Sequence, residues 1–143
     1  VRALSKLLRD NFGFALQGVG IVVPIFATFD AGVSPSARLY FYDAMGAQFE
    51  ATDFAATGSG SPAVRGILYY ENTWGEKPLQ KINEDEAVVV ALRALDTAAE
   101  ADTATGGIDR HAKIFPVMKI VGAAGIRTLP EEKIAELFHE RVE

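Results

Sequence analysis

The chain has 143 residues, 49% hydrophobic and 23% charged, which is typical of one globular domain. Its net charge of −5 and the lack of any Lys/Arg cluster argue against nucleic-acid binding. The absence of cysteine excludes a disulfide scaffold, a zinc-thiolate site and a Cys nucleophile. The two histidines, His111 and His139, are interpreted as solvated surface residues, so no metal or cofactor site is expected. The longest apolar run, Val19–Phe29, is interrupted by Pro24, so no transmembrane helix is expected.

The beginning of the chain has the pattern of an amphipathic helix without a start signal. Apolar residues recur at helical spacing from Ala3 to Phe12, and only Val1 and Arg2 precede them. A helix normally begins with a capping residue that satisfies its free N–H groups. We therefore expect this helix to begin upstream of Val1, in a longer protein of which the chain is the C-terminal part. A frayed terminal helix is the alternative.

Three strands are predicted next. Residues Gly20–Asp30 form a short run that is apolar on both faces, which indicates a buried strand. The aromatic segment Arg38–Asp43 is expected to be a second strand. A tight turn between Asp43 and Gly46 leads into a returning strand at Ala47–Phe54, which predicts a hairpin.

The second half of the chain alternates helix signals and a further hairpin. Ser61 is a predicted N-cap, and Pro62 is then the first residue of a helix to about Glu71. Asn83 and Glu86 have the spacing of a capping box for a helix to about residue 101. The remaining expectations are strands at Ile114–Val121 and Ile126–Leu129, and a last helix opened by Pro130 with the apolar stripe Ile134, Leu137, Phe138 and Val142.

This order of elements predicts the fold class. A helix, three strands, two helices, two strands and a helix, with the strands grouped in hairpins, indicate an α+β fold with antiparallel sheets. Strands that are apolar on both faces suggest two stacked sheets with helices outside. We expect residues 1–143 to form a single domain.

Two segments are unusually rich in glycine and hydroxyl residues, at 56–61 and 101–107. Each lies at a helix end, so a capping turn and a helix-terminating loop are their plain structural interpretations. Phosphate binding is a further alternative, but the lysine of a P-loop is absent, since Arg65 lies four residues after Ser61. Gly58, Gly60 and Gly66 also lack the spacing of a dinucleotide-binding loop. Asp102 faces the negative end of a helix dipole, which suggests that its carboxylate is kept for a partner.

Motifs spread along the chain resemble the C-terminal part of a proteasome β-type subunit of the actinobacterial kind. The similarity covers essentially all 143 residues in order, and the pairing of GSGS with DTATGG some forty residues later is its most specific part. The matching stretches are Gln17-Gly18 before Val22-Val23-Pro24, Leu39–Asp43, Thr57–Ser61, Asp85-Glu86-Ala87, Asp102–Gly107 and Ile114-Phe115-Pro116.

The resemblance implies a threonine-type endopeptidase of the N-terminal nucleophile hydrolase class. The fold expected from it is a four-layer αββα sandwich of antiparallel sheets, here incomplete at the N-terminus. Such enzymes use an N-terminal Thr as nucleophile and its own α-amine as base. Val1 has no hydroxyl, so the nucleophile is absent from this chain. The resemblance assigns Ser59, Asp102 and Thr105 to a network that holds the amine and its water, with glycines 58, 60, 106 and 107 allowing close approach of the backbone.

The resemblance also implies partners. It predicts assembly with other β-type subunits and with α-type ring subunits, an ATP-dependent regulator acting through the α ring, and unfolded polypeptide as the substrate. Neither nucleic acid nor membrane is expected, and the location implied is cytoplasmic. Three alternatives stay open: a noncatalytic structural subunit of such a ring, a free-standing small binding domain, and the simpler bacterial double-ring peptidase. The Ser61-Pro62 start and the loop at 105–109 favour the proteasome type over the last.

Overall fold

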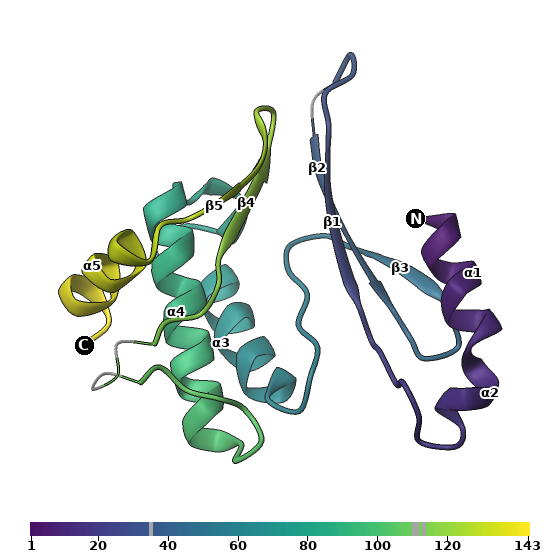
Figure 1. Ribbon diagram of the computed structural model, residues 1–143. Coiled ribbons are helices and arrows are strands. Elements are labelled where there is room, and N and C mark those ends of the chain that lie inside the picture. The colour runs from purple at the N-terminus through teal and green to yellow at the C-terminus, as the bar shows by residue number, and fades with distance from the viewer. Residues whose placement is uncertain (35, 110–111, 113) are drawn as a thin grey trace. The chain divides into compact units, whose positions relative to one another are not determined.

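A computed structural model describes residues 1–34, 36–109, 112 and 114–143. His111 lies outside the described residues, and so does Pro35 in the predicted loop before the second strand. The observed elements confirm the predicted α+β order and add two short helices, α2 and η1. In chain order they are α1 (Arg2–Asp10), α2 (Phe12–Ala15), β1 (Ile25–Asp30), β2 (Ser36–Tyr42), β3 (Gln48–Ala51), α3 (Ser61–Trp74), η1 (Leu79–Lys81), α4 (Glu84–Ala101), β4 (Lys119–Gly122), β5 (Gly125–Thr128) and α5 (Glu131–Arg141) (Figure 1).

The contacts of the chain group into two compact units. Unit 1 comprises residues 1–57 and 121–124, and unit 2 comprises residues 58–120 and 125–143. Each unit is described by itself below. The prediction of a single domain over residues 1–143 stays a prediction.

Unit 1 contains an antiparallel sheet in the order β1-β2-β3. In its register, Phe41 of β2 lies opposite Ile25 of β1 and Phe49 of β3. The predicted turn between β2 and β3 is present, because the Asp43 carboxylate accepts hydrogen bonds from the backbone N–H groups of Met45 (2.9 Å) and Ala47 (2.8 Å). Such side-chain bonds to the following backbone are the reason that Asp favours turns.

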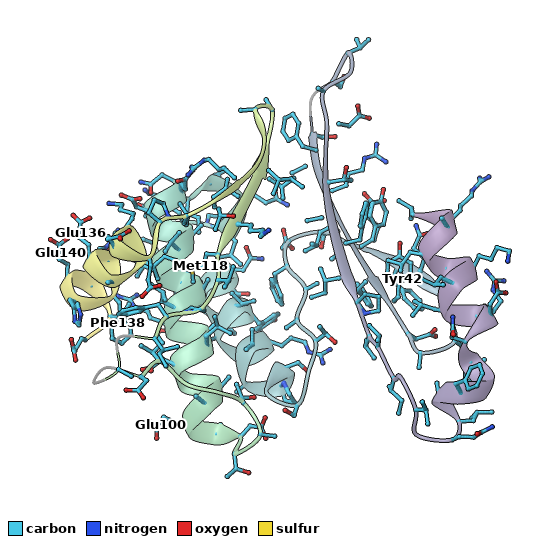
Figure 2. The ribbon with its side chains drawn as sticks, viewed as in Figure 1. Tyr42, Glu100, Met118, Glu136, Phe138 and Glu140 are labelled. Carbon is cyan, nitrogen blue, oxygen red and sulfur yellow. The ribbon has the colours of Figure 1, made fainter. Side chains whose placement is uncertain are left out.

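The two faces of this sheet differ. Tyr42 is 1% exposed and donates a hydrogen bond from its hydroxyl to the carbonyl oxygen of Val1 (3.3 Å), which fixes the beginning of α1 against the sheet (Figure 2). On the opposite face, Ile25, Phe41 and Phe49 form an exposed apolar row. The rings of Phe41 and Phe49 stack with their centroids 5.2 Å apart. We call Ile25, Phe41 and Phe49 the apolar row of unit 1.

The prediction of a buried strand over Gly20–Asp30 is wrong in two respects. The strand begins only at Ile25, directly after Pro24, which lacks the N–H that a ladder position needs. The side chains from Ile21 to Val23 are exposed, and β1 carries no fully buried residue. The returning strand β3 is likewise shorter than the predicted 47–54.

The hydrophobic core lies in unit 2, where α4 packs against both α3 and α5 (Figure 1). Phe138 of α5 is completely buried, and its ring meets that of Phe115 edge-on at 5.9 Å (Figure 2). The predicted stripe of α5 is therefore confirmed as its core face. The core residues are Val88, Val89, Leu92, Ile108, Leu129, Ile134, Leu137 and Phe138, with Phe115, Met118, Ile120 and Val142 packed against them.

Two boundaries in unit 2 differ from expectation. The helix predicted to end near Glu71 continues to Trp74, where Gly75 terminates it. The strand predicted from Ile114 begins only at Lys119, because Ile114 instead forms an isolated bridge with Asp109. Among the helices of the described residues, none is both long and apolar enough to cross a bilayer.

The beginning of α4 is held by a capping box and by ion pairs. The predicted capping box is confirmed, because Asn83 Oδ1 accepts from the Glu86 N–H (2.9 Å) and Glu86 Oε2 accepts from the Asn83 N–H (2.8 Å). The three acids of the first turn also pair with cations from three other segments. The pairs are Glu84 with Arg127 of β5, Asp85 with Lys133 of α5, and Glu86 with Lys77.

We expect the stability of the complete subunit to depend on pH partly through Glu86. Its hydrogen bond from Lys77, together with that from the Asn83 N–H, lowers the pKa of the Glu86 carboxyl. A carboxyl whose pKa is lower in the folded state stabilises the fold above its unfolded pKa of about 4.3, and that contribution disappears as pH falls through the folded value. The Glu86→Gln variant should therefore lose less stability than wild type as the pH falls from about 5 to about 3. Thermal unfolding of both proteins at each pH measures this difference.

The control for this prediction is Glu132→Gln, which removes an exposed carboxylate from the first turn of α5. It should keep the wild-type slope over the same pH range. Identical slopes for wild type and Glu86→Gln would contradict the expectation.

Candidate functional site

The two glycine- and hydroxyl-rich segments lie at neighbouring helix ends in unit 2. Gly60 is the N-cap of α3, and Asp102 is the C-cap of α4. Because α3 packs along α4, the beginning of α3 lies beside the end of α4 (Figure 1). Both plain interpretations, a capping turn and a helix-terminating loop, are thus confirmed. The prediction that Ser61 is the N-cap is wrong, because Ser61 is already the first helical residue.

The two segments converge on the Asp102 carboxylate. Thr105 Oγ1 donates a hydrogen bond of 2.5 Å to Asp102 Oδ2, and the Ala104 N–H approaches Oδ1 at 3.4 Å. From the other segment, Gly60 packs against Thr105, and the neighbouring Ser59 hydroxyl lies close enough to this carboxylate to lower its pKa. The structure therefore brings together the three residues that the sequence singled out, Ser59, Asp102 and Thr105, although 43 positions separate the first two in the chain.

These contacts keep Asp102 ionised. The hydrogen bond from Ser59 lowers the pKa of the Asp102 carboxyl most, followed by the bond from Thr105, while partial burial acts in the opposite direction. Donors directed at a carboxylate stabilise its charged form. The beginning of α3 next to the same loop supplies the positive end of a helix dipole, which offsets the unfavourable dipole of α4. Asp102 is thus a fixed negative charge at neutral pH.

Gly60 is what allows the two segments to approach so closely. A Cβ atom at Gly60 would lie 2.5 Å from Thr105 Oγ1 and 3.1 Å from the Cβ of Ala98, which is fully buried on α4. Gly107 has a similar but looser contact, 3.1 Å from the Cβ of Ala99. Among the described residues, nothing lies within 4 Å of a Cβ placed at Gly58 or Gly106; Gly58 is required for its positive φ of 93°.

Sequence reasoning missed one side chain that touches this turn. Arg65 Nη2 donates to the Ser61 hydroxyl (2.8 Å), and Ser61 is only 6% exposed. The signal was available, since Ser61 and Arg65 are four residues apart on a predicted helix and therefore lie on one face. Sequence reasoning also missed Ala98, whose small side chain makes room for Gly60.

The donors and acceptors of the cluster define its chemistry. An ionised carboxylate only accepts hydrogen bonds, so Thr105 directs its single hydroxyl proton at Asp102, and the Ser59 hydroxyl can interact with that carboxylate only as a donor. Their free lone pairs then form a surface that can only accept. Ser59 is exposed, and Asp102 and Thr105 are half-buried, so a third group can reach this surface. The arrangement suits a nitrogen that donates, such as an amine or ammonium group.

A metal is not the natural occupant of this cluster, which has a single carboxylate. More broadly, residues 1–34, 36–109, 112 and 114–143 contain no group of three or more His, Cys, Asp or Glu side chains that could hold a metal ion. The second histidine, His139, is exposed on α5, where its Nδ1 lies 2.5 Å from Glu143 Oε2.

Comparison with known proteins adds the family context. The family model described as "Proteasome subunit" matches residues 1–114. "Proteasome subunit beta 2" of Thermomonospora curvata is 44% identical over 140 residues, covering 95% of this chain and 46% of that protein. "Proteasome subunit beta 1" of Streptomyces avermitilis is 39% identical over 142 residues, covering 98% of this chain and 48% of that protein. "Proteasome subunit beta" of Streptomyces griseus is 33% identical over 140 residues, covering 98% and 47%.

The chain thus spans about half the length of the curated relatives it matches. The relatives are actinobacterial β subunits, and the family model alone covers more than half of this chain. These matches confirm the resemblance read from the motifs, and the chain belongs to the proteasome subunit family.

Proposed function

We propose that this chain is part of a β-type subunit of a 20S proteasome, a threonine-type endopeptidase that degrades unfolded proteins inside a ring-shaped particle. The nucleophilic Thr lies outside these 143 residues, and the chain supplies Ser59, Asp102 and Thr105 as the supporting network. The observation that carries this proposal is the close packing of two distant turns, Gly60 against Thr105, beside the Asp102 carboxylate that Thr105 hydrogen-bonds. The β-type role is also supported by the similar proteins, which are named proteasome β subunits.

The chemistry of the network matches the need of an N-terminal nucleophile. A free α-amine has a pKa of about 7.7–8.0, which suits a general base near neutral pH. To act, that amine must be held in one orientation and its protonated form must be stabilised when it takes the Thr proton. The Asp102 charge stabilises an ammonium, and the lone pairs of Ser59 and Thr105 accept its N–H groups. These residues act on the amine and its water and do not attack the substrate themselves.

The complete fold that we propose is a four-layer αββα sandwich. Its support in this chain is the apolar row of unit 1, in which Phe41 is 39% and Phe49 is 47% exposed. An apolar sheet face is normally covered by another layer. In the proposed sandwich a second sheet covers this row.

The partners that we propose are those expected of a subunit in a ring-shaped proteasome particle. They are other β-type subunits, α-type ring subunits, an ATP-dependent regulator acting through the α ring, and unfolded polypeptide as substrate, in the cytoplasm. The exposed aromatic cluster at the end of α3 is compatible with a subunit contact. In this cluster, Tyr69 and Tyr70 both contact Trp74, with ring centroids 5.7 and 6.0 Å apart.

The proposal is tested by comparing this chain with the complete subunit. The 143-residue chain alone should hydrolyse no fluorogenic peptide, because it lacks the nucleophile. Assembled particles containing the complete subunit should hydrolyse such a peptide, and an inhibitor that reacts with a hydroxyl and an adjacent amine should abolish the activity. Mass spectrometry should locate the adduct on an N-terminal Thr. Inhibitor-sensitive cleavage by the isolated chain would contradict the proposal, and assembled but inactive particles would favour the noncatalytic structural subunit.

A further inference from the structure

The turn that carries Ser59 has a defined geometry. The Ser61 N–H donates to the carbonyl oxygen of Gly58 (3.1 Å), so Ser59 and Gly60 are the two central residues of a tight turn. The positive φ of Gly58 (93°) sets the entry of the chain into this turn. On one side, Gly60 packs against Thr105. The direction of the Ser59 side chain therefore depends on how firmly the other side, at Ser61, is held.

Arg65 holds Ser61 from the next turn of α3. Its Nη2 donates to Ser61 Oγ (2.8 Å), and its Nε points at the Ser61 carbonyl oxygen (3.4 Å). A guanidinium is a rigid planar fork with donors only, so both Ser61 oxygens must accept from it. The two contacts together fix the side chain and the carbonyl group of one buried residue.

The helix dipole gives no reason for a cation here. A cation near the beginning of a helix opposes the helix dipole, and the first turn of α3 has no acidic residue to offset it. Arg65 is also not one of the groups that shift the pKa of the Asp102 carboxyl. What the Arg65 side chain contacts is the end of the turn that presents Ser59.

We propose that Arg65 is a positioning residue for the reaction, acting through Ser61 to hold Ser59 against the Asp102 carboxylate. This inference rests on the proposed function and extends the supporting network by two residues. The sequence of contacts runs from Arg65 to Ser61, through the turn to Ser59, and on to Asp102. Loss of the contact between Arg65 and Ser61 leaves substrate binding intact and lowers the fraction of particles in which the amine is correctly held.

The test uses particles assembled from the complete subunit. Arg65→Met keeps the length of the stem and removes the donors, and Ser61→Ala removes the acceptor. Each should lower kcat by about threefold to tenfold, with KM changed by less than about twofold, because the lost hydrogen bond acts on the amine only indirectly, through the turn. The double variant should be no worse than the more damaging single one, because both remove the same interaction. Arg65→Lys should recover part of the loss.

Arg93→Met is the matched control, since Arg93 is a similarly exposed arginine whose Nη2 donates to the carbonyl oxygen of Arg141 (2.8 Å). It should leave kcat unchanged. Wild-type kcat in Arg65→Met, or additive losses in the double variant, would overturn the proposal.

Hydrogen exchange separates this inference from the proposed function. Amides of residues 58–61 should exchange faster in Arg65→Met particles than in wild type, and at the wild-type rate in Arg93→Met. This readout does not require catalysis, so it decides the role of Arg65 even if Asp102→Asn particles prove fully active and the proposed function fails. If Arg65→Met does not assemble, Ser61→Ala, which removes the acceptor of the same hydrogen bond, takes its place in the comparison. Unchanged exchange at 58–61 in the variant that assembles would overturn the inference.

Discussion

Asp102→Asn in the complete subunit should lower peptide turnover by about tenfold or more, or block maturation of the particle. The substitution preserves the shape of the side chain but removes the charge that stabilises a protonated amine. It also replaces one acceptor oxygen with an NH₂ group, which only donates. The hydroxyl of Thr105, which donates to this carboxylate, or the nearby hydroxyl of Ser59 would then have to accept from the new NH₂ group. Hydrolysis of a fluorogenic peptide and the mass of the mature N-terminus measure the two effects.

Glu100→Gln is the matched control for the loss of charge. Glu100 is exposed in the last turn of α4, two residues before Asp102, so its removal changes the net charge of the same helix end (Figure 2). Glu100→Gln particles should keep wild-type turnover. Wild-type turnover in correctly assembled Asp102→Asn particles would remove Asp102 from the network.

Gly60→Ala should damage the site almost as severely, although it changes no polar group. The backbone of Gly60 is compatible with alanine (φ −75°, ψ −2°), so the cost is purely steric. The new methyl group would lie 2.5 Å from Thr105 Oγ1 and 3.1 Å from the Ala98 Cβ. Relieving that overlap must rotate the Thr105 hydroxyl away from Asp102 or push the two segments apart, at a cost of about 1–3 kcal/mol for an overpacked site. We expect a lower melting temperature and loss of most of the turnover.

Gly66→Ala provides the comparison, because Gly66 lies on the same helix with nothing within 4 Å of its added Cβ. Alanine in a helix interior is favoured over glycine by about 0.5–1 kcal/mol, so this variant should be as stable as wild type or slightly more so. Thermal unfolding and turnover of both variants should be measured side by side. Equal stability and turnover for Gly60→Ala and Gly66→Ala would show that the close approach at Gly60 is unimportant.

Local signals in the sequence predicted the helices of unit 2 well. The capping box at Asn83 and Glu86 fixed the beginning of α4 to the residue, since it depends only on contacts three residues apart. The core stripe of α5 was equally readable from its spacing. Burial in unit 1 could not be predicted from spacing, because an apolar strand is buried only if another layer covers it. The large apolar side chains from Ile21 to Phe26 are exposed in this chain.

The candidate site was reached through its motifs and not through periodicity. Ser59, Asp102 and Thr105 were named by resemblance, and their spacing of more than forty residues carries no geometric information without the packing of α3 on α4. The same limit explains why the sequence predicted a close approach of the backbone at Gly60 but not the residue that it approaches. Its contact with Thr105 is long-range and is visible only in three dimensions.

The most direct test is a structure of the assembled particle containing the complete subunit. We expect the α-amine of an N-terminal Thr within hydrogen-bonding reach, about 2.6–3.2 Å, of the Ser59 or Thr105 oxygen or of the Asp102 carboxylate, directly or through one water. An N-terminal amine bound elsewhere, with Ser59, Asp102 and Thr105 facing a different group, would contradict this role for the two turns.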